Sequence, residues 1–379
     1  MSAAVVHSAR GQPESAGDLD KVGTAEAVEF RAEIFPLPLL IVRLAYAQQG
    51  AAGIVAVTVP ADERSFKTGV RGGIMASVSL WWRAVRPFSF TVSIIPPIMG
   101  GIVALIENPD LPFSLIRFAL TAVGCVVAHA GANLLSDYYD FRARVDRKGT
   151  FGSSGLLVER TMSPREIFMG AWIALIAAAL IGAYLVFVIP EGIFLVWLIL
   201  IGAVLGIFYT AGPVEFKYRA LGDVAVFVSF GPAMVLGAYY VQAHRFSWNP
   251  VLYGLPIALL VDAILHGNNL RDIANDRAVG IKTVPILIGE EGAKLMYYGL
   301  VFGAYVLTCI LILVAALPPF SLITLLSLPM AIKLANMVRR KKEMPVEQFA
   351  VIDATTAQLH LFFGLLTIIG LLLHYFVVM

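Results

Sequence analysis

The chain alternates between long apolar stretches and short polar ones. From about residue 89 onward, apolar runs of about 20 residues recur, the length that a helix needs to cross a hydrocarbon core of ~30 Å. Because lipid offers the backbone no hydrogen-bond partner, each run should be helical. We therefore predict an all-α polytopic membrane protein with nine transmembrane helices. The predicted spans are approximately 89–107, 113–136, 166–188, 192–210, 221–242, 251–270, 293–315, 319–337 and 355–377.

The loops between the predicted spans alternate in charge. Loops on one side carry clusters of arginine and lysine, whereas those on the other side carry Arg245 as their one basic residue. The positive-inside rule puts the basic loops in the cytoplasm. Trp82, Arg83 and Arg86 precede the first span and agree with a cytoplasmic N-terminal side, so nine spans would leave the C-terminus outside. The absence of a clear targeting peptide favours a bacterial inner (plasma) membrane over an organelle.

Residues 1–74 differ from the rest of the chain. The stretch "HSARGQPESAGDLDKVGTAEAVEF" is polar and typical of disorder. The stretch "IFPLPLLIVRLAY" is apolar but short, and Pro36, Pro38 and Arg43 interrupt it. Met75 stands just ahead of "SVSLWWRAVRPFSF", which suits an interfacial entry to the first span. We expect residues 1–74 to be a disordered or non-functional extension, residues 75–379 to be the membrane domain, and the functional chain to begin near Met75.

Composition supports a membrane protein and argues against one class of partner. Of 379 residues, 59% are hydrophobic and 14% are charged, whereas soluble domains carry about 25% charged residues. The net charge is +2 and no long basic run stands outside the membrane loops, which argues against a nucleic-acid partner. Cys125 and Cys309 each lie in an apolar run, which indicates buried thiols rather than a zinc site or a disulfide framework.

Two polar clusters interrupt the apolar pattern, each at the cytoplasmic end of a predicted span. In each cluster an asparagine is followed by two aspartates at helical spacing, which puts the side chains on one face. The first cluster, ending the second span, contains Asn133, Asp137 and Asp140. The second, ending the sixth span, contains Asn268 or Asn269, Asp272 and Asp276. Two carboxylate faces at one membrane depth can converge inside a bundle.

Carboxylate and amide oxygens are hard ligands that suit Mg²⁺, which commonly bridges to substrate phosphates. Metal ions held by two acidic clusters would neutralise a diphosphate leaving group, and the apolar bundle would house a long hydrocarbon. One such cluster alone would more simply be a solvated helix end paired with arginines. Two matched clusters, each followed by basic residues, favour a site. The basic residues that would assist are Arg271, Arg277, Lys282, Lys217 and Arg144.

The two clusters carry a resemblance to a known family. "NLLSDYYDFRARVD" and "NNLRDIANDRAVGIKT" resemble the two Asp-rich motifs of the UbiA superfamily of intramembrane aromatic prenyltransferases. The resemblance extends from about Trp81 to the end of the chain and includes the helix count. "SLWWRAVRPFSFTVSIIPPIMG" and "YTAGPVEFKYRALGDVAVFVSFGPAMVLGAYYVQ" are most similar to the members that prenylate 1,4-dihydroxy-2-naphthoate in menaquinone synthesis, and animal members share the "YYDF" style.

This resemblance implies a Mg²⁺-dependent reaction of polyprenyl diphosphate at the cytoplasmic side. The allylic cation would alkylate 1,4-dihydroxy-2-naphthoate with loss of its carboxylate, giving demethylmenaquinone. The residues implied as catalytic metal ligands are Asp137, Asp140, Asp272 and Asp276. The residues implied around the phosphates and the acceptor are Asn133, Asn268, Asn269, Arg277, Lys282, Lys217 and Tyr209.

Other polar residues have two interpretations each. Ser136 stands where many family members carry an asparagine, so one usual amide ligand is a hydroxyl here. Tyr138 and Tyr139 would line the prenyl cavity or stabilise a cation through their ring faces, or serve as interfacial aromatics. Asp262 and His266, one turn apart, would either orient the aromatic acceptor or form a satisfied polar pair between helices.

Three alternatives stay open. Prenylation of another acceptor, such as a hydroxybenzoate or a lipid, would use the same motifs, because these chiefly hold the diphosphate. A transporter is a different class, although the acids here lie at the cytoplasmic edge rather than at midplane. The third is a non-catalytic quinone-binding membrane protein, against which the retention of all four central aspartates argues.

Overall fold

The structure is a computed structural model that describes residues 74–378, and everything below concerns that part of the chain. Residues 1–73, on which the expectation of an N-terminal extension rests, lie outside the described range, and a functional start near Met75 stays a prediction. The described residues contain no strand, only an isolated bridge between Arg219 and Lys282. The all-α prediction is confirmed.

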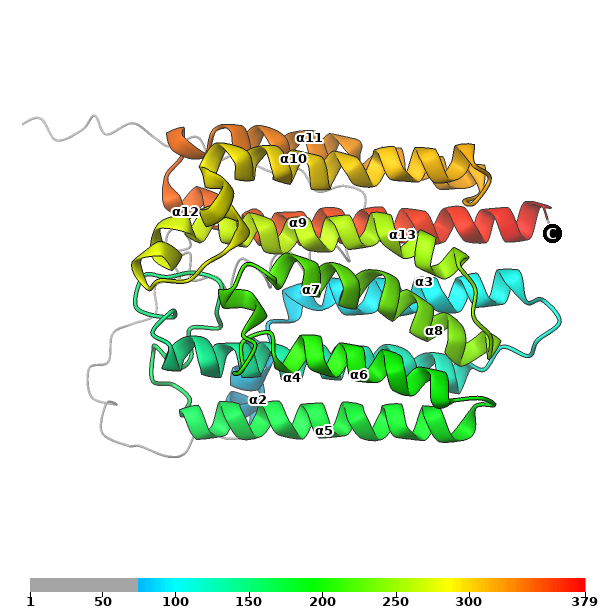
Figure 1. Ribbon diagram of the computed structural model, residues 1–379, viewed down its shortest axis with the longest axis horizontal. Coiled ribbons are helices and arrows are strands. Elements are labelled where there is room, and N and C mark those ends of the chain that lie inside the picture. Colours follow the sequence, from blue (N-terminus) through cyan, green and yellow to red (C-terminus); the bar gives the residue numbers. More distant parts are fainter. Residues whose placement is uncertain (1–73, 379) are drawn as a thin grey trace, which may run out of the picture. The chain divides into compact units, whose positions relative to one another are not determined.

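The described chain is a succession of helices (Figure 1). The α-helices are α2 (Ile74–Ala84), α3 (Thr91–Glu107), α4 (Leu115–Arg142), α5 (Pro164–Val188), α6 (Ile193–Ile207), α7 (Gly222–Val228), α8 (Met234–Ala243), α9 (Asn249–Ala278), α10 (Val284–Leu313), α11 (Leu328–Arg339), α12 (Val346–Phe349) and α13 (Ile352–Val378). Short 3₁₀ or π segments are η1 (Pro87–Phe90), η2 (Phe216–Tyr218), η3 (Ser229–Ala233), η4 (Pro319–Ser327) and η5 (Lys341–Glu343).

Eight helical segments of the described chain are long and apolar enough to cross a membrane, where nine were predicted. Some of the eight combine several elements: α7, η3 and α8 together form Gly222–Ala243, and η4 and α11 together form Pro319–Arg339. The remaining predicted span, 192–210, is the shorter helix α6. Its 15 residues reach roughly 23 Å, which falls short of a ~30 Å hydrocarbon core.

The two helices with Asp-rich ends are longer than the predicted spans. Helix α4 has 28 residues and α9 has 30, so they extend for roughly 42 Å and 45 Å. Both exceed the thickness of a hydrocarbon core, so the surplus carries the polar ends of the helices beyond it. Helix α4 continues to Arg142 and α9 to Ala278, so the acidic residues of both clusters lie on helices, at the spacing that was predicted.

Close packing of these helices depends on small residues. Helix α4 packs along α5, α9 packs along α10 and α13, and α3 packs along α8 and α13. Gly231 in η3 faces α9, where a Cβ atom would lie 2.3 Å from the Cβ of Ala258 and 3.0 Å from the carbonyl oxygen of Gly254. Glycine at this crossing therefore lets the two backbones approach, as is common between membrane helices.

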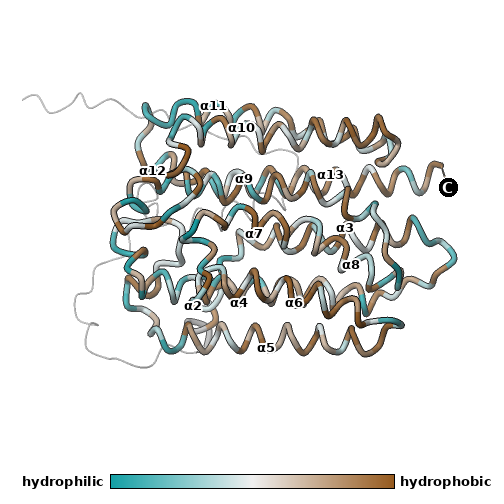
Figure 2. Tube along the Cα trace, viewed as in Figure 1, coloured by the Kyte–Doolittle hydropathy of each residue, from teal (hydrophilic) through white to brown (hydrophobic). Residues whose placement is uncertain are grey.

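Hydrophilic segments gather at the ends of the helices and hydrophobic ones along their lengths (Figure 2). Loop 143–163 follows α4, loop 208–221 follows α6, and loop 279–283 follows α9. The first and third of these loops follow the helix ends that carry the acidic residues, and contacts described below join loops 143–163 and 208–221 to those residues. The fold thus brings the two Asp-rich clusters and their basic loops to the same end of the helices.

Candidate active site

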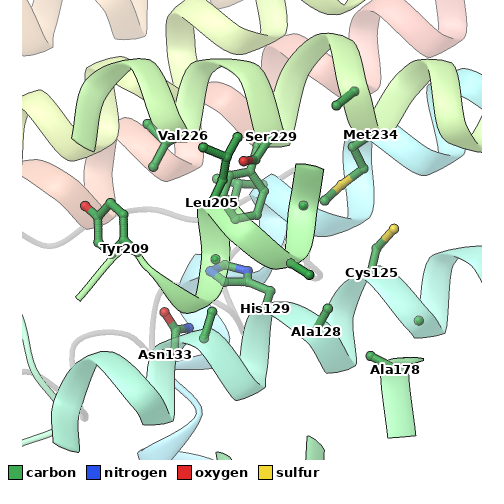
Figure 3. A pocket seen from close by; sticks show the side chains of 18 of the residues that line it. Cys125, Ala128, His129, Asn133, Ala178, Leu205, Tyr209, Val226, Ser229 and Met234 are labelled. Carbon is green, nitrogen blue, oxygen red and sulfur yellow. The ribbon is translucent and has the colours of Figure 1, made fainter. Parts of the chain in front are cut away.

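A cavity of about 560 Å³ lies among α4, α5, α6, α8 and α9. Most of its wall is leucine, isoleucine, alanine and glycine. Figure 3 shows Asn133 and Tyr209 in one part of this space and Cys125 and Met234 in another. The cavity thus has an apolar body and a polar end, which suits a ligand with a hydrocarbon chain and a charged head. The polar and charged residues of that end are Arg86, Asn133, Ser136, Lys217, Asn268 and Asp353.

The first acidic cluster is held by side chains that come from elsewhere in the chain. Asp140 is 3% exposed, and one of its oxygens accepts hydrogen bonds from Lys217 Nζ at 2.7 Å and from Ser136 Oγ at 3.0 Å. Its other oxygen accepts from the Tyr218 hydroxyl at 2.8 Å. A buried carboxylate with an ammonium and two hydroxyl donors is well satisfied in its charged form. Loop 208–221 is thereby tied to α4.

Asp137, the other carboxylate of this cluster, is also buried and partnered. Its Oδ2 accepts a hydrogen bond from the backbone N–H of Ser154 at 3.0 Å, and its Oδ1 lies 3.3 Å from a guanidinium nitrogen of Arg86. The Arg86 guanidinium also donates to the carbonyl oxygen of Gly152 at 2.5 Å. Loop 143–163 is thus folded back over the end of α4 by contacts to this carboxylate and this arginine.

The second acidic cluster is organised around Arg271. Its guanidinium donates to both carboxylate oxygens of Asp272, at 3.0 Å and 2.8 Å, and to the side-chain oxygen of Asn268. It also donates to Asp353 on α13 at 3.0 Å. The ring of Phe151 lies 5.6 Å from the guanidinium carbon. Arg271 therefore joins α9, α13 and loop 143–163, and it orients the Asp272 carboxylate.

A second, smaller cavity of about 20 Å³ lies between the two clusters, which is room for about one water or ion. Among the residues that line it, Asp146, Asn269 and Asp276 have side chains that form no hydrogen bond or ion pair within residues 74–378. Asp276 is nonetheless only 7% exposed. Asp276 shares this small cavity with the carboxylates of Asp146 and Asp272, an arrangement that a bound cation would stabilise. Gly152, Lys217 and Asn268 line both cavities, so the small polar cavity adjoins the large apolar one.

The pKa shifts of two loop residues also indicate an excess of negative charge at this site. Burial, together with the nearby carboxylates of Asp140 and Asp137, raises the pKa of Asp146 well above its ordinary value. Burial disfavours the charged form of Lys217, but the carboxylate of Asp140 outweighs it and raises the pKa of the ammonium group. The site therefore holds more carboxylates than cations, and bound cations would relieve this surplus of negative charge. The cations are Arg86, Lys217 and Arg271, and the carboxylates are Asp137, Asp140, Asp146, Asp272, Asp276 and Asp353.

The acidic residues do not form a metal site by themselves. Within residues 74–378, no three aspartate, glutamate, histidine or cysteine side chains lie close enough together to hold a metal ion. Mg²⁺ usually keeps several waters and takes one or two carboxylates plus substrate phosphates. The donor set, with pairs of carboxylates beside an amide and room between them, therefore fits Mg²⁺ bound together with a diphosphate.

The remaining predicted site residues divide into two groups. Asn133, Lys217, Tyr209 and Asn268 line the large cavity, and Asn269 lines the small one, so these lie together as predicted. Three basic residues and one aromatic line neither cavity; they are Arg144, Arg277 and Lys282, which are exposed, and Tyr139, which packs in a hydrophobic cluster. Roles for these four in binding stay predictions.

Three residues of the site were not singled out from the sequence as site residues. From the sequence, Arg86 indicates only the cytoplasmic side of the first span, although its position directly before Pro87 is a local signal. Tyr218 follows Lys217 directly, which is a local signal. Asp353 begins α13, far along the chain from the motifs, and no local pattern connects it to Arg271.

Asp262 and His266 belong to a different environment. His266 is fully buried, with Nδ1 3.1 Å from an Asp223 oxygen and Nε2 2.9 Å from the carbonyl oxygen of Ala293. Neither Asp262 nor His266 lines the large or the small cavity. His266 thus joins α7, α9 and α10 through Asp223 and Ala293 and does not pair with Asp262, whose buried Oδ1 has no hydrogen-bond partner among the described residues.

Comparisons with known proteins agree with this geometry. The sequence profile described as "UbiA prenyltransferase family" matches residues 94–361. A 1,4-dihydroxy-2-naphthoate octaprenyltransferase from Bacillus subtilis is 30% identical over 295 residues, covering 78% of this chain and 93% of that protein. The human UbiA prenyltransferase domain-containing protein 1 is 33% identical over 298 residues, covering 76% and 82%.

Solved structures show the same fold. A UbiA homologue from Archaeoglobus fulgidus, bound to DMAPP and Mg²⁺, aligns with a TM-score of 0.54 at 18% identity, covering 76% of this chain and 98% of that one. A UbiA homologue from Aeropyrum pernix aligns with a TM-score of 0.55 at 18% identity, covering 75% and 97%. At such identities the likeness concerns the fold alone.

Proposed function

Because the chain belongs to the UbiA prenyltransferase family, and is thus an integral membrane prenyltransferase, we propose that its acceptor is 1,4-dihydroxy-2-naphthoate and its donor a polyprenyl diphosphate. The observation that carries the proposal is the junction of the two cavities. A small cavity with unpartnered carboxylates adjoins a large apolar cavity, and Gly152, Lys217 and Asn268 line both. A cation would occupy the small cavity, the diphosphate head would lie where the two cavities meet, and the hydrocarbon chain would lie in the large cavity.

In the proposed reaction a carbon–oxygen bond of the donor breaks first, and a carbon–carbon bond to the acceptor then forms. The bond between the allylic carbon and the diphosphate breaks, and the electron pair leaves with the diphosphate. The ring carbon that carries the carboxylate attacks the allylic cation, and the carboxylate then departs as CO₂. The products are the prenylated dihydroxynaphthalene (a demethylmenaquinol), CO₂ and diphosphate; later oxidation of this quinol would give demethylmenaquinone. Diphosphate needs charge neutralisation to leave, which is where the acidic clusters and their cations act.

Mg²⁺, when bound, would neutralise the diphosphate charge, and the residues that would hold it are Asp137, Asp140, Asp272 and Asp276. Of the four, only the Asp276 carboxylate forms no hydrogen bond or ion pair within residues 74–378. Asn268 and Asn269 would supply amide contacts beside it. Arg271 keeps the Asp272 carboxylate in one orientation through two hydrogen bonds. A fixed ligand loses little entropy on binding a metal ion.

Lys217 is the basic side chain best placed to meet the diphosphate. It lines both cavities, and its ammonium is already held 2.7 Å from Asp140. The shift of its pKa keeps the group charged. The apolar cavity wall would exclude water from the allylic cation, which water would otherwise capture. The protein thus places a positive charge beside the diphosphate and excludes water from the hydrocarbon end of the donor.

The proposal also specifies the acceptor, a naphthoate, and the cellular location. The Bacillus subtilis relative supports the naphthoate, but the human protein, which is named only for its domain, is as similar. The basic loops support a cytoplasmic site in a bacterial inner membrane. The proposal therefore needs a test that varies the acceptor.

The test is a membrane assay with radiolabelled farnesyl or geranylgeranyl diphosphate and a panel of aromatic acceptors, with Mg²⁺ or with EDTA, read by product mass. We expect a lipophilic product that needs both dihydroxynaphthoate and Mg²⁺ and has lost the carboxylate. A product with another acceptor would replace the naphthoate and keep the chemistry. No product with any acceptor, from folded protein, would favour a quinone-binding or transport protein.

A further inference from the structure

A polar side chain of α4 lines the large cavity and lies farther from the Asp-rich end of the helix than Asn133 does. His129 on α4 lines the cavity and is 9% exposed. It lies one helical turn before Asn133 and two turns, roughly 12 Å along the helix, before Asp137. Figure 3 shows its ring in the same part of the cavity as Asn133, Ser229 and Tyr209. A bound hydrocarbon chain could form no hydrogen bond with this polar group.

The hydrogen bonds around His129 indicate which ring nitrogen carries the proton. The Ser93 hydroxyl donates to the carbonyl oxygen of Phe90 at 3.2 Å, and a carbonyl can only accept. With its one hydroxyl hydrogen on the Phe90 carbonyl, the Ser93 oxygen is free to accept from His129 Nδ1–H, which is 3.1 Å away, and our inference takes this tautomer. In a neutral imidazole with a proton on Nδ1, Nε2 is a hydrogen-bond acceptor.

The acceptor nitrogen is left without a partner and its ring is held in place. Within residues 74–378, Nε2 of His129 has no hydrogen-bond partner, although the ring lines the cavity. The ring packs edge-on against Phe90, with centroids 5.7 Å apart, and against Phe230, with centroids 5.0 Å apart. Two aromatic neighbours and Ser93 therefore fix an unsatisfied lone pair in an apolar space, where only a donor would satisfy it.

We propose that His129 Nε2 accepts a hydrogen bond from a ring hydroxyl of the aromatic acceptor, and that this contact selects hydroxylated aromatic acceptors. A prenyl chain carries no donor, and a carboxylate would present an acceptor to an acceptor. A hydroxyl on an aromatic ring is the donor that an apolar wall and a lone pair would recognise together. This inference rests on the proposed function and gives it a residue that discriminates between acceptors.

The sharpest test compares acceptors that differ in their hydroxyl groups. Binding of 1,4-dihydroxy-2-naphthoate and of 2-naphthoate, which has no hydroxyl, is measured on the full chain in detergent by naphthalene fluorescence, with Mg²⁺ and diphosphate present. We expect wild-type protein to bind the dihydroxy compound about 10 to 100 times more tightly, and His129→Phe to reduce that ratio to about 3 or less. His129→Gln, whose amide oxygen can replace Nε2, should restore part of the ratio.

Two further variants separate this contact from a structural role. Ser93→Ala removes the group that fixes the tautomer, so the ratio should fall to an intermediate value. Thr121→Val is the matched control, because Thr121 lines the same cavity on α4 and its hydroxyl already bonds the carbonyl oxygen of Arg117. Its ratio should not change. If His129→Phe does not fold, the Gln and Ser93→Ala variants carry the test.

The outcomes distinguish the two proposals. An unchanged ratio in folded His129→Phe, or an equal loss of affinity for prenyl diphosphate, would overturn the role of His129 even if wild-type protein prenylates dihydroxynaphthoate. Absence of prenylated dihydroxynaphthoate from wild-type protein would overturn the naphthoate proposal, and the hydroxyl comparison would then be made with the acceptor that is used. A smaller ratio with unchanged diphosphate affinity supports the inference.

Discussion

The two acidic clusters resemble each other in sequence and differ in their surroundings. On α4, Asp137 and Asp140 are held by cations and donors from other parts of the chain: Arg86 for the first, Lys217 for the second. On α9, Arg271 holds Asp272, but Asp276 has no partner among the described residues. The difference suggests that the first cluster also holds the loops together, whereas the second keeps a ligand position free. Substitutions can test this contrast.

The largest expected effect is on turnover. Asp276→Asn should lower kcat/KM by at least about 100-fold, because it removes the unpartnered carboxylate that we propose binds Mg²⁺. Titration of activity with Mg²⁺ measures the loss, and EDTA should abolish wild-type activity. Asp110→Asn, an exposed acid in the loop after α3, is the control and should behave like wild type. An active Asp276→Asn enzyme with ordinary Mg²⁺ dependence would contradict the assignment.

The second effect concerns stability and separates the two clusters. Asp140→Asn leaves the Lys217 ammonium without its carboxylate, so we expect the free energy of unfolding to fall by about 3 kcal/mol. Asp276→Asn should leave stability unchanged or slightly raised, because no protein partner is lost. Thermal unfolding in detergent with EDTA measures both. Equal destabilisation of the two variants would remove the contrast drawn above.

A smaller effect should come from the residue that holds Arg271. Asp353→Asn weakens one of the contacts that orient the guanidinium against Asp272, so the Mg²⁺ concentration for half-maximal activity should rise about 10-fold. The saturated rate should change much less, since Asp353 is a positioning residue. Equal losses at low and saturating Mg²⁺ would instead indicate a general structural defect.

The smallest effects are expected at the exposed basic residues. Arg144→Ala, Arg277→Ala and Lys282→Ala should each raise KM for the prenyl diphosphate by no more than about threefold, because exposed charges act weakly and through solvent. The effect should shrink further at high salt. A loss of 100-fold at any of the three would show that its side chain reaches the diphosphate in the bound state, as the family resemblance implies for Arg277 and Lys282.

Much of the architecture follows from local pattern. Hydropathy and length locate the spans, and helical spacing predicts that Asp137 and Asp140 share a face. Helix α6 differs because hydropathy alone does not show where the chain turns, which happens after Ile207. Helices α4 and α9 also end farther along the chain than the predicted spans, at Arg142 and Ala278. Their polar ends stay helical because residues elsewhere in the fold form hydrogen bonds with several of their side chains.

The sequence by itself determined the membrane class, the helical content and the presence of two acidic faces, because hydropathy and periodicity act over a few turns. Tertiary structure decided which charges meet, because Lys217 and Asp140 are 77 residues apart and Arg271 and Asp353 are 82 apart. It also decided that Asp276 and His129 Nε2 stay unpartnered among the described residues. Whether a polar group is satisfied depends on side chains that only the packed helices bring within about 3 Å.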